Sequence, residues 1–203
     1  MDLSGRLEEH EQRPGKLIVL SGPSGVGKDT LLRRLEEICP KIVRCVTYTT
    51  REPRSFEVPQ VDYNFVSAEG FRKMIDEGEF LEYAKVHRHM YGSPLAPVVE
   101  TREKGLDIVL KIDVQGGLVV RQKAPEAVMI FVAPPSMEEL ERRLRARYTD
   151  SEADIAKRLR DARGEIKHIP MYDYLVVNDD IEAAADKLRC IIIAERARVR
   201  SDN

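Results

Sequence analysis

Short apolar runs alternate with segments of helical periodicity along most of the chain. Four of the runs predict buried strands, at Leu17–Leu20, Gly105–Ile112, Ala127–Val132 and Tyr174–Val177. The intervening periodicity predicts helices from about Asp29, at Gln115–Lys123, from Ser136 through Arg147, at about Ser151–Lys167 and from Ile181 to about Val199. This alternation favours an α/β fold with a parallel, doubly wound sheet flanked by helices, whose site lies at the carboxyl ends of the strands.

The stretch between the first helix and Gly105 has a different pattern. Pro40 ends the helix, and the following residues predict strands at Ile42–Thr50, Asp62–Ser67 and Glu79–Ala84, a helix at Phe71–Glu77 and a turn at Tyr91–Pro94. This mixture indicates a small α+β domain inserted into the core. We therefore expect a mobile N-terminal tail at 1–15, a core at 16–46 and 97–203 with a lid at about 140–165, and an insert at 47–96.

The first predicted strand leads into a glycine-rich loop and then into a helix. The loop has the spacing G-x-x-x-x-G-K and comprises Gly22, Pro23, Ser24, Gly25, Val26, Gly27 and Lys28. Strand, loop and helix in this order predict a phosphate-binding loop. The glycines let backbone N–H groups converge on phosphate oxygens, and the helix N-terminus adds partial positive charge. Lys28 would then reach the terminal phosphates.

The residue after Lys28 departs from the usual loop, in which a Ser or Thr hydroxyl meets Mg²⁺. Here Asp29 follows Lys28, and Thr30 comes one position later. A carboxylate facing bare phosphates at ~4 Å would be repelled by about 4 kcal/mol near a protein surface. Asp29 is therefore expected either to bind a Mg²⁺ ion that separates it from the phosphates, or to turn away and cap the helix.

Composition narrows the class of protein. The 203 residues, 42% of them hydrophobic, suffice for one large domain with a full core, and the net charge of −2 gives no sign of bulk nucleic-acid binding. The sequence has no apolar run that predicts a membrane span, and its polar N-terminal segment does not resemble a signal peptide. Cys39, Cys45 and Cys190 lack metal-binding or redox spacing, so we expect free thiols and a cytoplasmic location.

Two groups of polar residues in or near the predicted insert are candidates for nucleotide binding. The first contains two arginines three positions apart and two tyrosines: Arg51, Arg54, Tyr63 and Tyr91. Such a group suits bidentate binding of one phosphate, although surface arginines in a loop would look the same. The second group contains two carboxylates and two hydroxyls: Thr47, Glu82, Ser93 and Asp113. Carboxylates accept only, so they suit guanine, with its adjacent N–H and amino group, and not adenine; solvated charges would show the same spacing.

Basic residues are concentrated in the helices of the expected lid: Arg142, Arg143, Arg145, Arg147, Lys157, Arg158, Arg160 and Arg163. Some of these side chains are expected to cover only a solvated helix face. Others could close over a triphosphate and neutralise the charge that develops during phosphoryl transfer.

Taken together, these features resemble the guanylate kinase family from about Lys16 to the last helix. The matching segments are, in order, GPSGVGK, TTREPR with Glu57, DYNFVS, EFLEYA, YGS, IDVQG, APPSMEELERRL, TDSEADIAKRL and YLVVND. The resemblance implies an ATP:GMP phosphotransferase of purine nucleotide metabolism, with a P-loop NTPase core, a GMP-binding insert and a mobile helical lid. It implies ATP and Mg²⁺ as cofactors, and dGMP as a further acceptor.

The resemblance also implies roles for individual residues. The GMP phosphate would be held by Arg51, Arg54, Tyr63 and Tyr91. Guanine would be recognised by Thr47, Glu82, Ser93 and Asp113. The ATP phosphates would be bound by Lys28 and the loop amides and covered by the lid residues Arg143, Arg147 and Arg158, with adenine beside Asn178. No side chain needs to act as a nucleophile, because the GMP phosphate attacks in line and catalysis consists of positioning and charge neutralisation.

Several positions depart from the family pattern. Phe56 and Tyr148 replace glycines, and Pro59-Gln60-Val61 replaces a glycine-containing turn. Lys111 occupies a position that is acidic in the family, on the metal side of a strand. We therefore expect the acid near Mg²⁺ to have moved from the strand to Asp29, with Lys111 paired either to Asp29 or to a phosphate.

Two alternatives deserve comparison. The GKD sequence also resembles the loop of ribose 1,5-bisphosphate phosphokinases, which share this fold, but the guanine-reading acids and the insert arginines argue against that acceptor. A non-catalytic guanylate-kinase-like interaction module would bind a phosphopeptide, but the intact loop and Lys28 argue against it. We expect the small molecules GMP and ATP as partners, with no nucleic acid and no membrane. The sequence leaves the oligomeric state open between monomer and homodimer.

Overall fold

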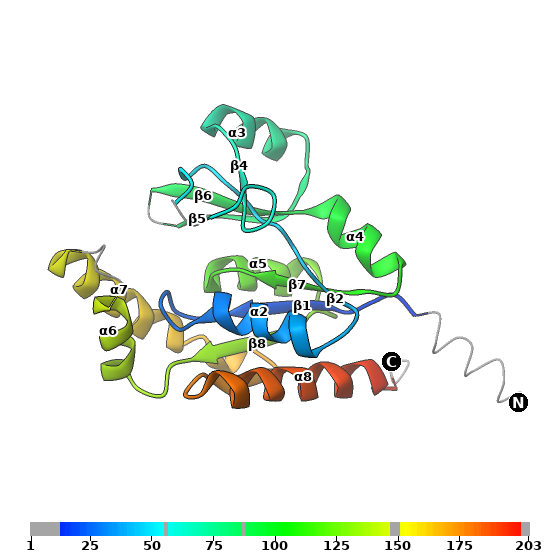
Figure 1. The fold of residues 1–203 in the computed structure, drawn as a ribbon. Coiled ribbons are helices and arrows are strands. Elements are labelled where there is room, and N and C mark those ends of the chain that lie inside the picture. The colour runs from blue at the N-terminus through cyan, green and yellow to red at the C-terminus, as the bar shows by residue number, and fades with distance from the viewer. Residues whose placement is uncertain (1–12, 55–56, 87, 147–150, 200–203) are drawn as a thin grey trace, which may run out of the picture. The chain divides into compact units, whose positions relative to one another are not determined.

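The computed structural model describes residues 13–54, 57–86, 88–146 and 151–199. Residues 1–12 of the expected tail, together with Phe56, Arg147 and Tyr148, lie outside the described residues. The described residues form two sheets, one of five strands in the order β2-β7-β1-β8-β9 and one of four in the order β4-β3-β6-β5 (Figure 1). The chain divides into two compact units. The first unit comprises the described residues up to Ile18 together with Lys41–Leu110. The second unit comprises Val19–Pro40 together with the described residues from Lys111 onward. The functional boundaries expected at 47 and 96 stay a prediction.

The first unit contains most of the short strands. Its elements are β2 (Ile42–Arg44), β3 (Tyr48–Thr49), β4 (Asn64–Phe65), α3 (Ala68–Asp76), β5 (Phe80–Val86), β6 (His89–Pro94), α4 (Leu95–Glu103) and β7 (Asp107–Lys111), whose last residue begins the second unit. β6 pairs antiparallel with both β3 and β5, whereas β3 pairs parallel with β4 and β2 pairs parallel with β7. The expected α+β character of this stretch is present.

Two local predictions in this unit are wrong. Ile42–Thr50 was expected as one strand, but it forms β2 in one sheet and β3 in the other, and the chain changes sheets after Cys45, whose N–H donates to Val109 O at 3.0 Å. Tyr91–Pro94 was expected as a turn but belongs to β6. Residue composition predicts extended backbone or a bend, whereas pairing partners decide which sheet a segment joins.

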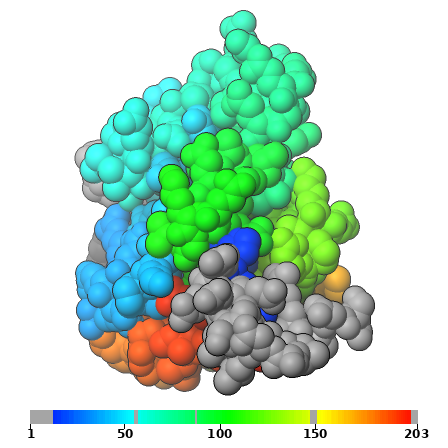
Figure 2. Space-filling view, turned by 90° about the vertical axis from the view of Figure 1, so that its right-hand side faces the viewer, coloured from blue at the N-terminus to red at the C-terminus, as the bar shows by residue number. Residues whose placement is uncertain are grey.

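The small sheet packs on aromatic side chains. The rings of Phe71 on α3 and Phe80 on β5 stack with centroids 4.6 Å apart. A Cβ at Gly92 would lie 2.8 Å from Phe80, so only glycine fits beneath this stack without movement. Helix α4, bright green in the space-filling view (Figure 2), was not predicted. Its Leu95 and Val99 side chains are exposed.

The second unit contains the glycine-rich loop. After β1 (Leu17–Ser21), which spans the division, it comprises α2 (Lys28–Ile38), α5 (Val114–Lys123), β8 (Val128–Ala133), α6 (Met137–Arg145), α7 (Glu152–Ile166), the 3₁₀ turn η1 (Ile169–Met171), β9 (Tyr174–Val177) and α8 (Ile181–Ala197). β8 and β9 pair in parallel, with Ile130 opposite Tyr174 and Ala133 opposite Val177. The predicted α/β class with a parallel central sheet is confirmed, and β9 has the predicted bounds.

Apolar packing fixes the helices of this unit. Every residue of β8 is buried, and Phe131 packs with Val114 of α5. Helices α2 and α8 contact each other along their length (Figure 1), and Arg34 Nε donates to Glu182 Oε2 at 2.8 Å between them. No helix among the described residues is both long and apolar enough to cross a membrane.

Candidate active site

The glycine-rich loop connects the end of β1 to the start of α2, as predicted. Gly22, Gly25 and Gly27 have φ of 145°, 91° and 96°, a backbone conformation that residues other than glycine rarely adopt. A Cβ at Gly22 would lie 2.1 Å from Val132 O, and one at Gly27 would lie 2.5 Å from Asn178 Nδ2. The loop is therefore held close to β8 and to the segment after β9. Glycine is therefore required at Gly22 and Gly27 both by the positive φ and by the close approach of neighbouring atoms.

Lys28 lies at the first position of α2 and folds back over its own loop. Its Nζ donates to Gly22 O, and to Pro23 O at 3.1 Å. Burial lowers the pKa of the Lys28 ammonium to about 8, although Glu165 and Asp29 nearby favour its charged form. The lysine is thus held by neutral carbonyl oxygens. Phosphate oxygens would be stronger partners for an ammonium group.

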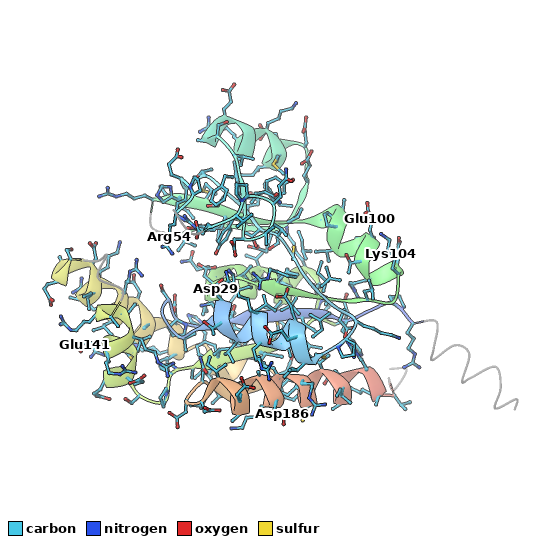
Figure 3. All side chains as sticks on the ribbon, viewed as in Figure 1. Asp29, Arg54, Glu100, Lys104, Glu141 and Asp186 are labelled. Atoms are coloured by element: carbon cyan, nitrogen blue, oxygen red, sulfur yellow. The ribbon has the colours of Figure 1, made fainter. Side chains whose placement is uncertain are left out.

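Asp29 lies at the N-terminal end of α2 (Figure 3). Lys111, the last residue of β7, donates from Nζ to Asp29 Oδ1, so of the two expected partners for Lys111 the carboxylate is the one observed. The Lys111 side chain is 8% exposed and that of Asp29 is 60% exposed. Thr30, the next residue, is exposed. The first turn of α2 therefore presents a carboxylate that is paired on one side and open to solvent on the other.

Asn178, which follows β9, binds the glycine-rich loop through its side-chain amide. It is 2% exposed, and its Nδ2 donates to Val26 O at 2.7 Å. Its own backbone carbonyl oxygen accepts from Arg143 Nη1 at 3.0 Å, and Arg143 Nε donates to Glu139 Oε1 at 2.7 Å. Hydrogen bonds from Arg142 and Arg143 lower the pKa of Glu139 to about 2. Arg143 is thereby oriented toward the loop.

The arginines of the expected lid fall into two groups. Arg143 and Arg158 reach the loop, the latter through a bond from Nη1 to Ser24 Oγ at 3.3 Å. Arg142 pairs with Glu139 on its own helix, and Arg145 pairs with Glu141 and Glu152. Arg147 lies outside the described residues. Proximity to the loop thus favours two of the three predicted lid arginines as candidate ligands.

Glu165, near the end of α7, was not predicted as a site residue. Burial raises the pKa of its carboxyl, while Lys28 opposes that rise. Its Oε2 is buried with no hydrogen-bond partner among the described residues. Glu165 follows Arg158 by seven positions, which places both on one face of α7. That spacing was the signal available in the sequence.

Arg51, in the first unit, is fixed by a carboxylate. Its Nη1 and Nη2 each donate to Glu57 at 2.8 Å, and its Nε donates to Tyr91 Oη at 3.2 Å. These bonds raise the pKa of Arg51, the one to Glu57 most strongly. Burial raises the pKa of Glu57, but the bonds from Arg51 and the Arg54 backbone outweigh burial, so that pKa lies below its ordinary value. Glu57 was recognised as part of a motif but not as a site residue.

The other members of the predicted phosphate group lie around Arg51. The Arg51 guanidinium carbon is 5.3 Å from the centroid of the Tyr63 ring, and the Tyr63 and Tyr91 rings are 6.1 Å apart. Arg54 is exposed (Figure 3), and its backbone N–H donates to Glu57 Oε2 at 2.8 Å. Three of the four predicted residues therefore form one contact group, and the fourth is joined to it through Glu57.

Three members of the predicted guanine group are buried in the first unit. Thr47, Glu82 and Ser93 are 4%, 2% and 0% exposed. Both Oγ and the backbone N–H of Ser93 donate to Glu82 Oε1, at 2.6 and 3.1 Å. Asp113 belongs to the second unit, where its Oδ1 caps α5 by accepting from Gly116 N at 2.9 Å. A buried carboxylate with a hydroxyl beside it is a suitable acceptor for an N–H donor.

A phosphate loop between a strand and a helix of a parallel α/β sheet defines the class as a P-loop NTPase fold. The sequence model of the guanylate kinase family matches residues 14–195. The chain belongs to the guanylate kinase family.

Individual relatives agree with this family. The guanylate kinase of Caldanaerobacter subterraneus subsp. tengcongensis is 48% identical over 188 residues, which cover 93% of this chain and 91% of the relative. That of Myxococcus xanthus is 52% identical over 186 residues, covering 91% and 89%. The crystal structure of guanylate kinase from Anaplasma phagocytophilum superposes with a TM-score of 0.77 at 36% identity, covering 93% of this chain and 89% of that one.

Proposed function

We propose that this chain transfers the γ-phosphoryl group of ATP to GMP, and also to dGMP. The observation that carries the proposal is the intact phosphate loop with Lys28 at its end, in a chain that matches the guanylate kinase family over residues 14–195. We further propose a cytoplasmic location, supported by the three free cysteines.

On the acceptor side, the GMP phosphate is assigned to Arg51, Arg54, Tyr63 and Tyr91. Support comes from the contacts among Arg51, Tyr63 and Tyr91, because a guanidinium already oriented by Glu57 loses little freedom on binding a phosphate. Guanine recognition is assigned to Thr47, Glu82, Ser93 and Asp113. The buried Glu82 carboxylate supports this choice, since it can accept from the ring N–H and the amino group of guanine.

On the donor side, the ATP phosphates are assigned to the amides of residues 22–28, to the Lys28 ammonium and to the lid arginines Arg143, Arg147 and Arg158, with adenine beside Asn178. The bonds of Arg143 to Asn178 and of Arg158 to Ser24 support this assignment for the described arginines. Lys28 would exchange the carbonyls of Gly22 and Pro23 for phosphate oxygens.

The residues at the start of α2 fit a Mg²⁺ ion carried by the nucleotide. Asp29 offers a solvent-exposed carboxylate, a hard oxygen ligand. The described residues contain no cluster of three or more His, Cys, Asp or Glu side chains able to hold a metal. One carboxylate with phosphate and water oxygens is the usual way in which proteins bind this ion. When bound, it neutralises charge on the phosphates.

The reaction needs no covalent intermediate on the protein. An oxygen of the GMP phosphate attacks the γ-phosphorus in line, a new P–O bond forms, and the bond to the β-phosphate oxygen breaks to release ADP and leave GDP. Lys28, Arg51 and the lid arginines position the two phosphates and neutralise charge. Exclusion of water by the lid would suppress ATP hydrolysis.

A coupled assay of ADP release with Mg-ATP tests this function. GMP, dGMP, AMP and ribose 1,5-bisphosphate are compared as acceptors. We expect turnover with GMP and dGMP and at most background turnover with the other two. Turnover confined to the sugar phosphate would reassign the acceptor. Tight GMP binding without turnover on any acceptor would support the non-catalytic module.

A further inference from the structure

The ion pair between Asp29 and Lys111 sets this loop apart from one that carries a hydroxyl after the lysine. The Lys111 side chain is almost completely buried, at 8% exposure, while that of Asp29 remains 60% exposed. A buried ammonium needs a compensating charge, because desolvation of an unpaired ion is costly. Asp29 supplies that charge and still presents an exposed side to solvent. Both charges also influence Lys28: Asp29 raises the pKa of its ammonium, and Lys111 lowers it.

The same carboxylate is the candidate metal ligand. A divalent ion bound to Asp29 would bring a second positive charge to within a few ångströms of the Lys111 ammonium, and like charges at such distances repel strongly even near a protein surface. Without either cation, the carboxylate would repel the nucleotide phosphates by the same law. Asp29 therefore needs one positive partner, and two at once are unfavourable.

We propose that Lys111 is an internal counter-cation that competes with the nucleotide-borne divalent ion for Asp29. Lys111 then acts as a positioning residue, through Asp29 and not through the reacting atoms. This inference rests on the proposed binding of ATP at the loop. It has a specific consequence: because Lys111 already neutralises Asp29, nucleotide binding should depend only weakly on the metal.

ADP binding with and without Mg²⁺ tests the competition in the absence of turnover. Calorimetry gives the dissociation constant of ADP in excess MgCl₂ and in EDTA. The constant in EDTA divided by the constant in MgCl₂ measures the metal's contribution to affinity. We expect Lys111→Met to raise this ratio at least tenfold, since Asp29 then repels metal-free ADP and is available to the metal. In an Asp29→Asn background, Lys111→Met should leave the ratio unchanged within a factor of two.

Two comparisons guard against trivial explanations. Lys187→Met makes the same substitution at an exposed position of α8 and should leave the ratio at its wild-type value. Asp29→Asn leaves the buried Lys111 ammonium without this partner and is expected to lower the unfolding temperature. The double variant Asp29→Asn/Lys111→Met removes both charges and should recover part of that loss. Circular dichroism verifies that each variant is folded at the temperature of the titration.

Titration of the free protein with Mn²⁺ alone provides a second readout. Followed by electron paramagnetic resonance, Lys111→Met should bind Mn²⁺ at least fivefold more tightly than the wild type, and the double variant should lose that gain. Equal metal dependence of ADP binding in wild type and Lys111→Met would overturn the proposal. So would a change that persists when Asp29→Asn is also present, because Lys111 would then act on the phosphates directly. Failure of every form to bind ADP would overturn the proposed function, and the Mn²⁺ titration would still decide the competition.

Discussion

Arg51, which we propose for the acceptor phosphate, and Lys28, which we propose for the donor phosphates, are held in opposite ways. Arg51 is fixed by two hydrogen bonds to the Glu57 carboxylate, which raise the pKa of the guanidinium. Lys28 is held by the carbonyls of Gly22 and Pro23, and its burial lowers the pKa of the ammonium. A carboxylate orients a cation and favours the charged form of that cation. Neutral carbonyl oxygens are weaker partners, which the cation can exchange for phosphate oxygens. With the proposed roles, this difference predicts an acceptor site that is formed before binding and a donor site that rearranges on binding.

The largest effect is expected from loss of the exchangeable cation. Lys28→Met should lower kcat by about 10³-fold, because charge on the transferring phosphoryl group is no longer neutralised there. ADP release with saturating GMP measures this effect. Lys187→Met, at an exposed position of α8, serves as the matched control and should retain wild-type kcat. A fall of less than about tenfold would show that Lys28 does not leave its carbonyl partners during turnover.

A smaller effect is expected from loosening the fixed arginine. Glu57→Gln keeps the shape of the side chain but removes the charge that orients Arg51, so KM for GMP should rise by about 10- to 100-fold, with a smaller change in kcat. The free energy of unfolding should fall by about 2 kcal/mol, since the side chains of Glu57 and Arg51 are only 6% and 14% exposed.

Glu52→Gln is the matched control for Glu57→Gln, because Glu52 is an exposed acid in the same loop. It should leave both KM and stability at wild-type values. If Glu57→Gln changed stability but not KM for GMP, the guanidinium would be a structural group and the acceptor site would need other residues.

The lowered pKa of Lys28 predicts that nucleotide binding depends on pH. In the free protein that pKa lies at about 8, so the amine is increasingly neutral at higher pH, whereas bound phosphates favour the ammonium. Nucleotide binding should therefore take up a proton above this pH, and ADP affinity should weaken about tenfold between about pH 7 and about pH 9. Calorimetry in two buffers of different ionisation enthalpy measures the proton uptake. Lys28→Met should show neither the uptake nor the pH dependence of affinity.

Local signals in the sequence were sufficient for many elements. The apolar run Tyr174–Val177 predicted β9 at its observed bounds, and strand, glycines and lysine predicted the loop before α2. The segment Ile42–Thr50 illustrates the limit. Its β-branched residues predicted extended backbone correctly, but its division between two sheets depends on pairing of β2 with β7 and of β3 with β6, which are distant in sequence.

The candidate site shows the same division. Motif spacing proposed Lys28, Arg51 and Glu82 as site residues, which stays a prediction, and left open whether Lys111 would meet Asp29 or a phosphate. It did not identify Glu165, or the way in which Asn178 holds Val26. The spacing of Glu165 from Arg158 places both on one face of a helix, but Lys28 and Glu165 come from separate elements, as do Asn178 and Val26, so no local pattern pairs them.

The sequence by itself determined the fold class, the phosphate loop and the family, because hydrophobic periodicity and glycine spacing act over a few residues of the chain. Only the tertiary structure decided that Lys111 contacts Asp29 and that Ser93 donates to Glu82. Those contacts depend on which strands become neighbours. Strand order and register result from burial of the whole apolar surface, a property of the entire chain.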